Sequence, residues 1–419
     1  MKLERPELFD GRDLLLFFLF ASLIAFFSLT FEYYRFTKLT LFDDAIVDAE
    51  VVQQYSKQKE GKAYQVLKLR MDKGGVFYTT GSNAIRDLQG YRLEMLIQTG
   101  RITFIDYLQN FFVYSKIIGI YPERSVRVTL SEEIAQIHAS LVTGEIFGAL
   151  FVASPMDQGL RERLSALGIS HLLAISGFHL GVLSFLAFWI FYPFYKRVQH
   201  CCMPYRHGNR DLFIMVGVVL FGYLLFLDFV PSLVRAFTMM MVGFVLYDRG
   251  LRVISIQTLL ISVILLIACW PRLFFALGFW LSVSGVFFIL LFLEHFSHWQ
   301  KRWQFIGIHI WVYLMMLPVS LALFETFSIY HPLSIIWTML FILFYPLELF
   351  LHLVGAGAWL DTGLLQILNL GTAQKLSLAW YVVVIQFIAA VAAIRYKKML
   401  IPLLGIVFAV FIHAVYEVA

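Results

Sequence analysis

Apolar runs long enough to cross a bilayer dominate the chain from residue 167 onward. They cover about residues 167–194, 212–227, 233–247, 253–270, 273–293, 305–325, 329–352, 376–394 and 399–416. A membrane-spanning helix needs about 20 mainly apolar residues, because the hydrocarbon core is about 30 Å thick. The whole chain has 60% hydrophobic and 15% charged residues, which is far from the composition of a soluble globular protein. We therefore predict an all-α polytopic membrane protein.

Another apolar run, Leu14–Thr30, follows three basic residues near the N-terminus. It is too long for the hydrophobic core of a usual signal peptide, and the sequence FEYYRF after it has no small-residue cleavage site. We predict that residues 1–31 form an uncleaved transmembrane anchor. This anchor brings the expected number of crossings to about ten.

Residues 43–122 have a mixed, charged composition that predicts a soluble domain. Short alternating runs, such as Ala63–Met71 and Gly75–Thr80, are separated by turn residues and indicate antiparallel strands. Several strands in about 80 residues fit a small all-β OB-like barrel, although other small β domains share this pattern. Residues 123–166 are helical and amphipathic, which predicts one or two helices on the membrane or against the bundle. Residues 167–419 then form the transmembrane domain.

Basic residues in the loops predict the orientation. The loop Lys196–Arg210 has four of them, whereas the opposite turn Asp228–Ser232 has none. Lys and Arg accumulate on the cytoplasmic side, so the N-terminus is expected inside and the β domain outside. If each apolar span from Phe305 onward crosses the membrane once, Lys397 and Lys398 lie outside. We therefore expect an extra crossing or a re-entrant segment within residues 329–374.

The run Gly168–Val182, GISHLLAISGFHLGV, places two histidines and two serines within an apolar span. Polar side chains at that depth are costly and are often functional. His171, Ser176 and His179 are therefore candidates to line a hydrated path. In the alternative interpretation, the serines bond to carbonyls of their own helix and the histidines join neighbouring helices without touching a substrate.

Catalytic and metal-binding interpretations of this run are weaker. Ser176 and His179 would form the nucleophile and base of an intramembrane hydrolase, but the sequence indicates no oxyanion hole. His171 and His179 lie about two turns apart without an accompanying carboxylate or Cys, which does not suit a metal site. The chain also has no nucleotide-binding signature. We expect no catalytic residue, metal or cofactor, and a protein that is not an enzyme.

The string Gly168–Val182 closely resembles the signature of the ComEC competence family, bacterial inner-membrane proteins that pass incoming single-stranded DNA into the cytoplasm during natural transformation. Two further strings, VPSLVRAFTMM at Val230–Met240 and GFWLS at Gly278–Ser282, are similar to blocks of that family. The resemblance adds Ser232, Arg235 and Ser282 to the candidate DNA path, with Arg235 as a guanidinium contact for phosphates. The alternatives are that Arg235 extends to the membrane surface and that Ser282 packs helices.

The chain departs from the family pattern in two respects. Many members continue into a metallo-β-lactamase-like domain, whereas this sequence has no His-x-His-x-Asp-His cluster. We expect a form without that domain, in which another protein degrades the strand that is not transported. The family also tends to have an Asn soon after a Ser-Pro-Leu turn, and residues 329–342, IYHPLSIIWTMLFI, contain none.

Basic and aromatic residues gather in one part of the β domain. Residues 57–73 contain six Lys or Arg against Glu60 and Asp72. A basic groove with interleaved aromatic rings binds single-stranded DNA through its phosphates and bases, whereas the alternative is a solvated face above core aromatics. The DNA-binding candidates are Lys57, Lys59, Lys68, Arg70, Lys73, Tyr78 and Arg92.

These observations together predict a multi-pass channel of the bacterial inner membrane that imports single-stranded DNA, with the OB-like domain in the periplasm. The expected partners are single-stranded DNA, membrane lipid, a periplasmic DNA receptor and a cytoplasmic DNA-handling protein or helicase; a homo-oligomer is left open. A small-solute secondary transporter is the alternative. It would also need polar residues within the membrane, but it has no use for an external OB-like domain.

Overall fold

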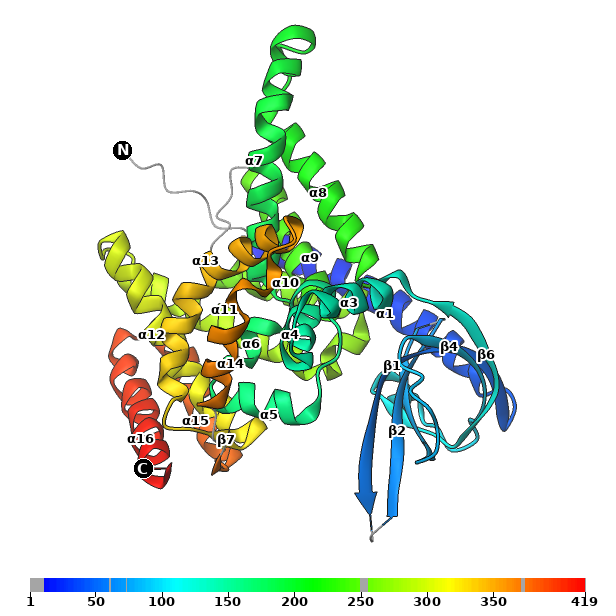
Figure 1. The fold of residues 1–419 in the computed structure, drawn as a ribbon. Helices are drawn as coiled ribbons and strands as arrows, with labels where there is room; N and C mark the ends of the chain where they lie inside the picture. The colour runs from blue at the N-terminus through cyan, green and yellow to red at the C-terminus, as the bar shows by residue number, and fades with distance from the viewer. Residues whose placement is uncertain (1–10, 60–61, 73, 249–254, 371–373, 419) are drawn as a thin grey trace. The chain divides into compact units, whose positions relative to one another are not determined.

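The computed structural model describes residues 11–59, 62–72, 74–248, 255–370 and 374–418 (Figure 1). The chain divides into two compact units. The barrel unit combines Phe9–Glu133 with Val263–Phe279, and the helical unit consists mainly of Ile134–Ser262 and Trp280–Ala419. We describe each unit by itself.

The barrel unit contains a six-stranded sheet with the order β5-β3-β2-β1-β4-β6. Its strands are β1 (Asp44–Lys59), β2 (Lys62–Met71), β3 (Val76–Ser82), β4 (Tyr91–Gln98), β5 (Phe111–Phe112) and β6 (Ser115–Arg124). The strands β5 and β6 follow each other in the chain, yet β5 pairs with β3 in parallel and β6 pairs with β4 antiparallel. The two ends of the sheet are thereby joined, and the sheet closes on itself.

Alternation along these strands builds the core of the barrel. Leu67, Leu69 and Phe77 are fully buried, while Lys68, between the two leucines, and Tyr78, next to Phe77, are partly exposed. The helix α1 (Gly11–Leu39) and the short segments α2 (Phe104–Leu108) and η1 (Pro271–Phe275) belong to the same unit. Arg272 of η1 bonds Glu32 of α1 at 2.9 Å and lies 4.4 Å from the centre of the Tyr107 ring of α2.

The helical unit contains α4 to α9 and α12 to α16, and α3, α10 and α11 each cross a unit boundary. The helices are α3 (Val126–Ile137), α4 (Leu141–Val152), α5 (Gln158–Ala166), α6 (Ser170–Leu173), α7 (Gly177–Cys202), α8 (Gly208–Phe226), α9 (Pro231–Asp248), α10 (Ile256–Cys269), α11 (Leu277–Phe296), α12 (Lys301–Phe324), α13 (Ser334–Leu353), α14 (Asp361–Asn369), α15 (Trp380–Arg395) and α16 (Leu400–Val418). Short segments flank some of them: β7 (Thr326–Phe327), η2 (His331–Leu333), η3 (Gly357–Leu360), β8 (Gln374–Lys375) and η4 (Lys397–Met399). The largest core joins residues of α4 to α9 with α13 and α14.

Among the residues that the structure describes, seven helices are long and apolar enough to cross a membrane. They are α1, α7, α8, α11, α12, α13 with η2, and α16 with η4. The predicted spans 233–247, 253–270 and 376–394 correspond to α9, α10 and α15, of 18, 14 and 16 residues, which are not among the seven. The chain is therefore a mostly helical membrane protein with an N-terminal β domain, as predicted.

The structure corrects two of the expectations for individual segments and bears on a third. The span 167–194 is not one helix, because it is interrupted between α6 and α7. The segment 123–166 forms three helices instead of one or two, and the middle one, α4, is largely buried and apolar instead of amphipathic. Within residues 329–374, α14 has only nine residues, which is too short to cross a bilayer.

Candidate functional site

Gly168, two residues after the end of α5, has a backbone conformation that favours glycine. Its φ is +69°, in the left-handed region, and its N–H donates to the carbonyl of Ser165 at 2.9 Å. A Cβ at this position would lie only 2.9 Å from atoms of the His331 imidazole. The glycine therefore allows both the backbone turn and the close approach of η2.

The polar run is broken between α6 and α7. Residues 174–176 are not helical, so some of their backbone groups lack partners within a helix. The Ser232 hydroxyl of α9 donates to the free carbonyl of Ile175 at 2.5 Å. A Cβ on Gly177 would lie 3.3 Å from Cβ of Ala236, so α9 also packs closely on the start of α7. The GISHLLAISG string and the PSLVRA string thus meet at this break.

Ser176 and His179 form a capping box at the start of α7. The Ser176 hydroxyl accepts from the N–H of Phe178 at 3.3 Å, and Nδ1 of His179 accepts from the N–H of Ser176 at 3.0 Å. His179 is 1% exposed and its ring meets the Tyr345 ring edge-on, with 4.6 Å between centres. Capping accounts for the short distance between Ser176 and His179, so this geometry favours a structural role over a catalytic dyad.

The other candidates of the DNA path lie in different surroundings. His171 is exposed, with Nε2 3.5 Å from the Thr338 hydroxyl of α13. Arg235 lies one turn after Ser232 on α9 and is only 5% exposed. This burial is the opposite of what an arginine extended to the membrane surface would show. Ser282 is exposed on α11, where its neighbour Leu281 packs against α12 and α15.

Comparison with known proteins identifies this helical region. A family model described as Competence protein matches residues 152–418, which is more than half of the chain. The chain belongs to the competence protein family. No curated protein and no solved structure matches it. The matched region of this competence protein includes the helix break, α9 and the segment around His331.

Sequence reasoning missed three residues at the break of the competence protein. His331 packs against Gly168, Thr338 approaches His171, and Tyr345 covers His179. All three lie within residues 329–352, where the sequence shows only an apolar span interrupted by prolines. The HPLS turn gave a signal at His331, because its polar residues and proline interrupt the apolar run.

Several basic candidates of the β domain have acidic partners. Arg70 bonds Glu50 at 2.8 Å, and Arg92 forms an ion pair with Asp72. Lys68 lies opposite Tyr78, with Nζ 5.9 Å from the centre of its ring. Arg70 and Arg92 are therefore already paired with carboxylates of the same domain.

The remaining candidates of this face differ in exposure. Lys57 is exposed, with Nζ 5.7 Å from the centre of the Tyr55 ring. Lys59 ends β1, and Lys73 lies outside the described residues. Phe77, which precedes the candidate Tyr78 on β3, is fully buried in the core and cannot stack on a base.

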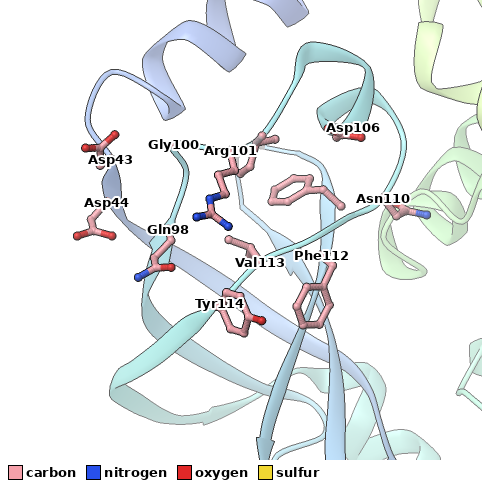
Figure 2. Close-up of a pocket in the computed structure, with 12 residues that line it drawn as sticks. Asp43, Asp44, Gln98, Gly100, Arg101, Asp106, Asn110, Phe112, Val113 and Tyr114 are labelled. Atoms are coloured by element: carbon pink, nitrogen blue, oxygen red, sulfur yellow. The ribbon is translucent and has the colours of Figure 1, made fainter.

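A cleft of about 870 Å³ lies where β4 leads to β5 in the barrel unit (Figure 2). Phe112 and Tyr114 line it at 53% and 67% exposure, and their rings meet edge-to-face. Arg101 lies across from them, and acidic groups occupy the rim. One of these, Asp106, has its pKa lowered by hydrogen bonds from the side chain and backbone of Thr103. Exposed rings beside one arginine suit a base better than a run of phosphates.

Proposed function

We propose that this competence protein is the inner-membrane channel through which single-stranded transforming DNA enters the cytoplasm. The observation that carries the proposal is the helix break, where strings from 168–179, 232–236 and 331–338 meet within the region matched by the family. Broken helices place backbone dipoles at membrane depth, which transport proteins use to contact charged cargo. Arg235 beside the break would supply the positive charge for phosphates.

The barrel unit supports the DNA assignment in a second way. The strands β1, β2 and β3 form a meander, β4 returns to β1, and the β5–β6 segment joins β3 to β4. We infer that this is an OB-like barrel, a fold that binds oligonucleotides on the face of its second and third strands and on its loops. In this chain that face holds Lys68 and Tyr78. The cleft that Phe112 and Tyr114 line, here called the aromatic cleft, is formed mainly by residues from the end of β4 to just after β5.

The channel would act without making or breaking bonds, with the barrel in the periplasm. A periplasmic DNA receptor would deliver the strand to the barrel, and a cytoplasmic DNA-handling protein would receive it. The bias of basic loops toward one side supports this orientation.

The deciding experiment follows labelled DNA in cells that lack this protein. We expect DNA to enter the periplasm normally and to be absent from the cytoplasm. Loss of uptake into the periplasm would place the protein at an earlier step, and normal arrival in the cytoplasm would exclude a channel role.

We predict that the full-length protein binds single-stranded DNA through the aromatic cleft. Replacing Phe112 and Tyr114 together by Ala should weaken binding about 10- to 100-fold, since one stacked base contributes about 1–3 kcal/mol. Fluorescence anisotropy with a labelled oligonucleotide in detergent measures this. Lys116→Ala, an exposed residue of β6, is the matched control. Equal affinity in the double variant would remove the cleft from the DNA-binding surface.

We predict that the loop between α7 and α8 faces the cytoplasm, and that the β domain and the turn between α8 and α9 face the periplasm. Native Cys201 and Cys202 are exposed at the end of α7, in the basic loop expected inside. They should react with an impermeant maleimide only after permeabilisation. With the native cysteines replaced by Ser, a Cys at exposed Asn83 or Phe229 should react in intact spheroplasts. Reaction of the Cys201 loop from the periplasm would invert the topology.

A further inference from the structure

Four side chains form a continuous chain of polar contacts inside the helical unit. Asp361 begins α14 and lies 2.9 Å from Nδ1 of His138, in the connection between α3 and α4. Nε2 of His138 lies 3.1 Å from Nε2 of His352, in the last turn of α13. Nδ1 of His352 lies 2.8 Å from the carbonyl of Glu348 and 3.4 Å from its carboxylate.

The hydrogen bonds in this chain require one more proton than two neutral imidazoles supply. The Glu348 carbonyl only accepts, so Nδ1 of His352 carries a hydrogen. One further hydrogen lies between the two Nε2 atoms, and a third lies between His138 and Asp361. Two neutral imidazoles carry only two hydrogens. The third proton therefore resides on the histidine pair or on Asp361.

The surroundings favour a positive charge on the histidine pair. His352 is in the last turn of α13, where the helix dipole stabilises a cation, and Asp361 is in the first turn of α14, where it stabilises an anion. The Glu348 side chain is fully buried beside His352, and its carboxylate has no hydrogen-bond partner within the described part of the chain. Thr143 of α4 contacts Asp361 at 3.3 Å, and the Phe147 ring stacks on His138.

The location also suits reversible binding of the proton. The His138 and Glu348 side chains are completely enclosed, whereas those of Asp361 and His352 are 11% and 9% exposed. A proton can thus be exchanged at the edge of the chain while its centre stays dry. Gly357 of η3 lies against the His352 ring, where a Cβ would come within 2.8 Å.

We propose that Asp361, His138, His352 and Glu348 form a proton-binding site that fastens α14 to α13 and to the α3–α4 connection. When the proton leaves, the two Nε2 lone pairs face each other and the link between His138 and His352 is lost. The hydrogen bond between His138 and His352 is therefore formed at low pH. It is lost when the pH rises and the shared proton leaves. A metal ion would need further ligands, and among the described residues no group of three or more His, Cys, Asp or Glu is arranged to hold one.

The test is nitrogen NMR on ¹⁵N-histidine-labelled full-length protein in lipid nanodiscs. We expect two histidines with protonated Nδ1 atoms and a scalar coupling between their Nε2 atoms across a shared hydrogen. The coupling should vanish in His138→Gln and in His352→Gln and should persist in His413→Gln. His413 is the matched control, since it is exposed and paired with Glu417 four residues later on α16. An unprotonated Nδ1 on either histidine would overturn the proposal.

A second measurement keeps the test valid if the two histidine variants fail to fold. The midpoint of thermal unfolding of the wild-type protein should fall by at least about 3 °C across the pH range in which the coupling between the two Nε2 atoms disappears. Glu348→Gln removes the buried negative charge at nearly constant volume, so the coupling should disappear at a lower pH than in the wild type. An unchanged pH for this loss in Glu348→Gln, or stoichiometric bound zinc in the purified protein, would refute the proton site.

Discussion

Arg235→Lys is expected to lower transformation about 10- to 100-fold while the protein stays at its normal level in the membrane. Arg235 is 5% exposed on α9, one turn after the serine that bonds the helix break. If its guanidinium binds phosphates through two parallel hydrogen bonds, a lysine keeps the positive charge but cannot form both bonds at once with the same geometry. Losing a hydrogen bond to a charged group costs about 1.5–3 kcal/mol, which corresponds to this range. Colony counts after transformation, with immunoblots of membranes, measure it.

Further variants separate a phosphate contact from a structural ion pair. Arg235→Gln removes the charge and should abolish transformation in either case. Adding Asp228→Asn would restore part of the activity if the two residues pair, and would restore none if Arg235 meets phosphates. Arg210→Lys, at an exposed site in the first turn of α8, is the matched control. Full transformation by both Arg235→Lys and Arg235→Gln would exclude a role in DNA handling.

Gly168→Ala is expected to destabilise the helical unit by about 2–5 kcal/mol. A left-handed φ costs a residue with a side chain about 1–3 kcal/mol, and forcing a methyl group into a packed site costs a similar amount. Here the new methyl would lie 2.9 Å from the His331 ring. The midpoint of thermal unfolding in detergent, followed by tryptophan fluorescence, should fall clearly.

Two comparisons isolate the cause of that loss. Gly181→Ala lies in the same polar run, but a Cβ there has open space and no left-handed φ, so we expect no loss. His331→Ala combined with Gly168→Ala removes the steric part and should restore some stability, leaving only the cost of the backbone conformation. If Gly168→Ala unfolds at the same temperature as the parent, the approach of η2 to this turn is looser than the structure has it.

The barrel illustrates what alternation in sequence can and cannot predict. The strands of residues 44–124 were predictable because buried and exposed side chains alternate along them. The partners of Arg70 and Arg92 were not, because Glu50 and Asp72 become neighbours only through strand pairing and turns. Phe112 and Tyr114 were missed as well, since exposed aromatics in and just after a short strand resemble core residues in sequence.

The sequence by itself determined that this is a polytopic membrane protein with an N-terminal β domain, because apolar length and alternation are local properties. It also determined family membership, through strings that the match over 152–418 confirms. Only the tertiary structure decided that Gly168–Val182 is broken between α6 and α7, where Ser232 of another helix donates to the carbonyl of Ile175. The pairing of His138 with His352 likewise joins residues 214 positions apart. Contacts at such separation depend on how helices pack, and a single sequence has no local signal for that.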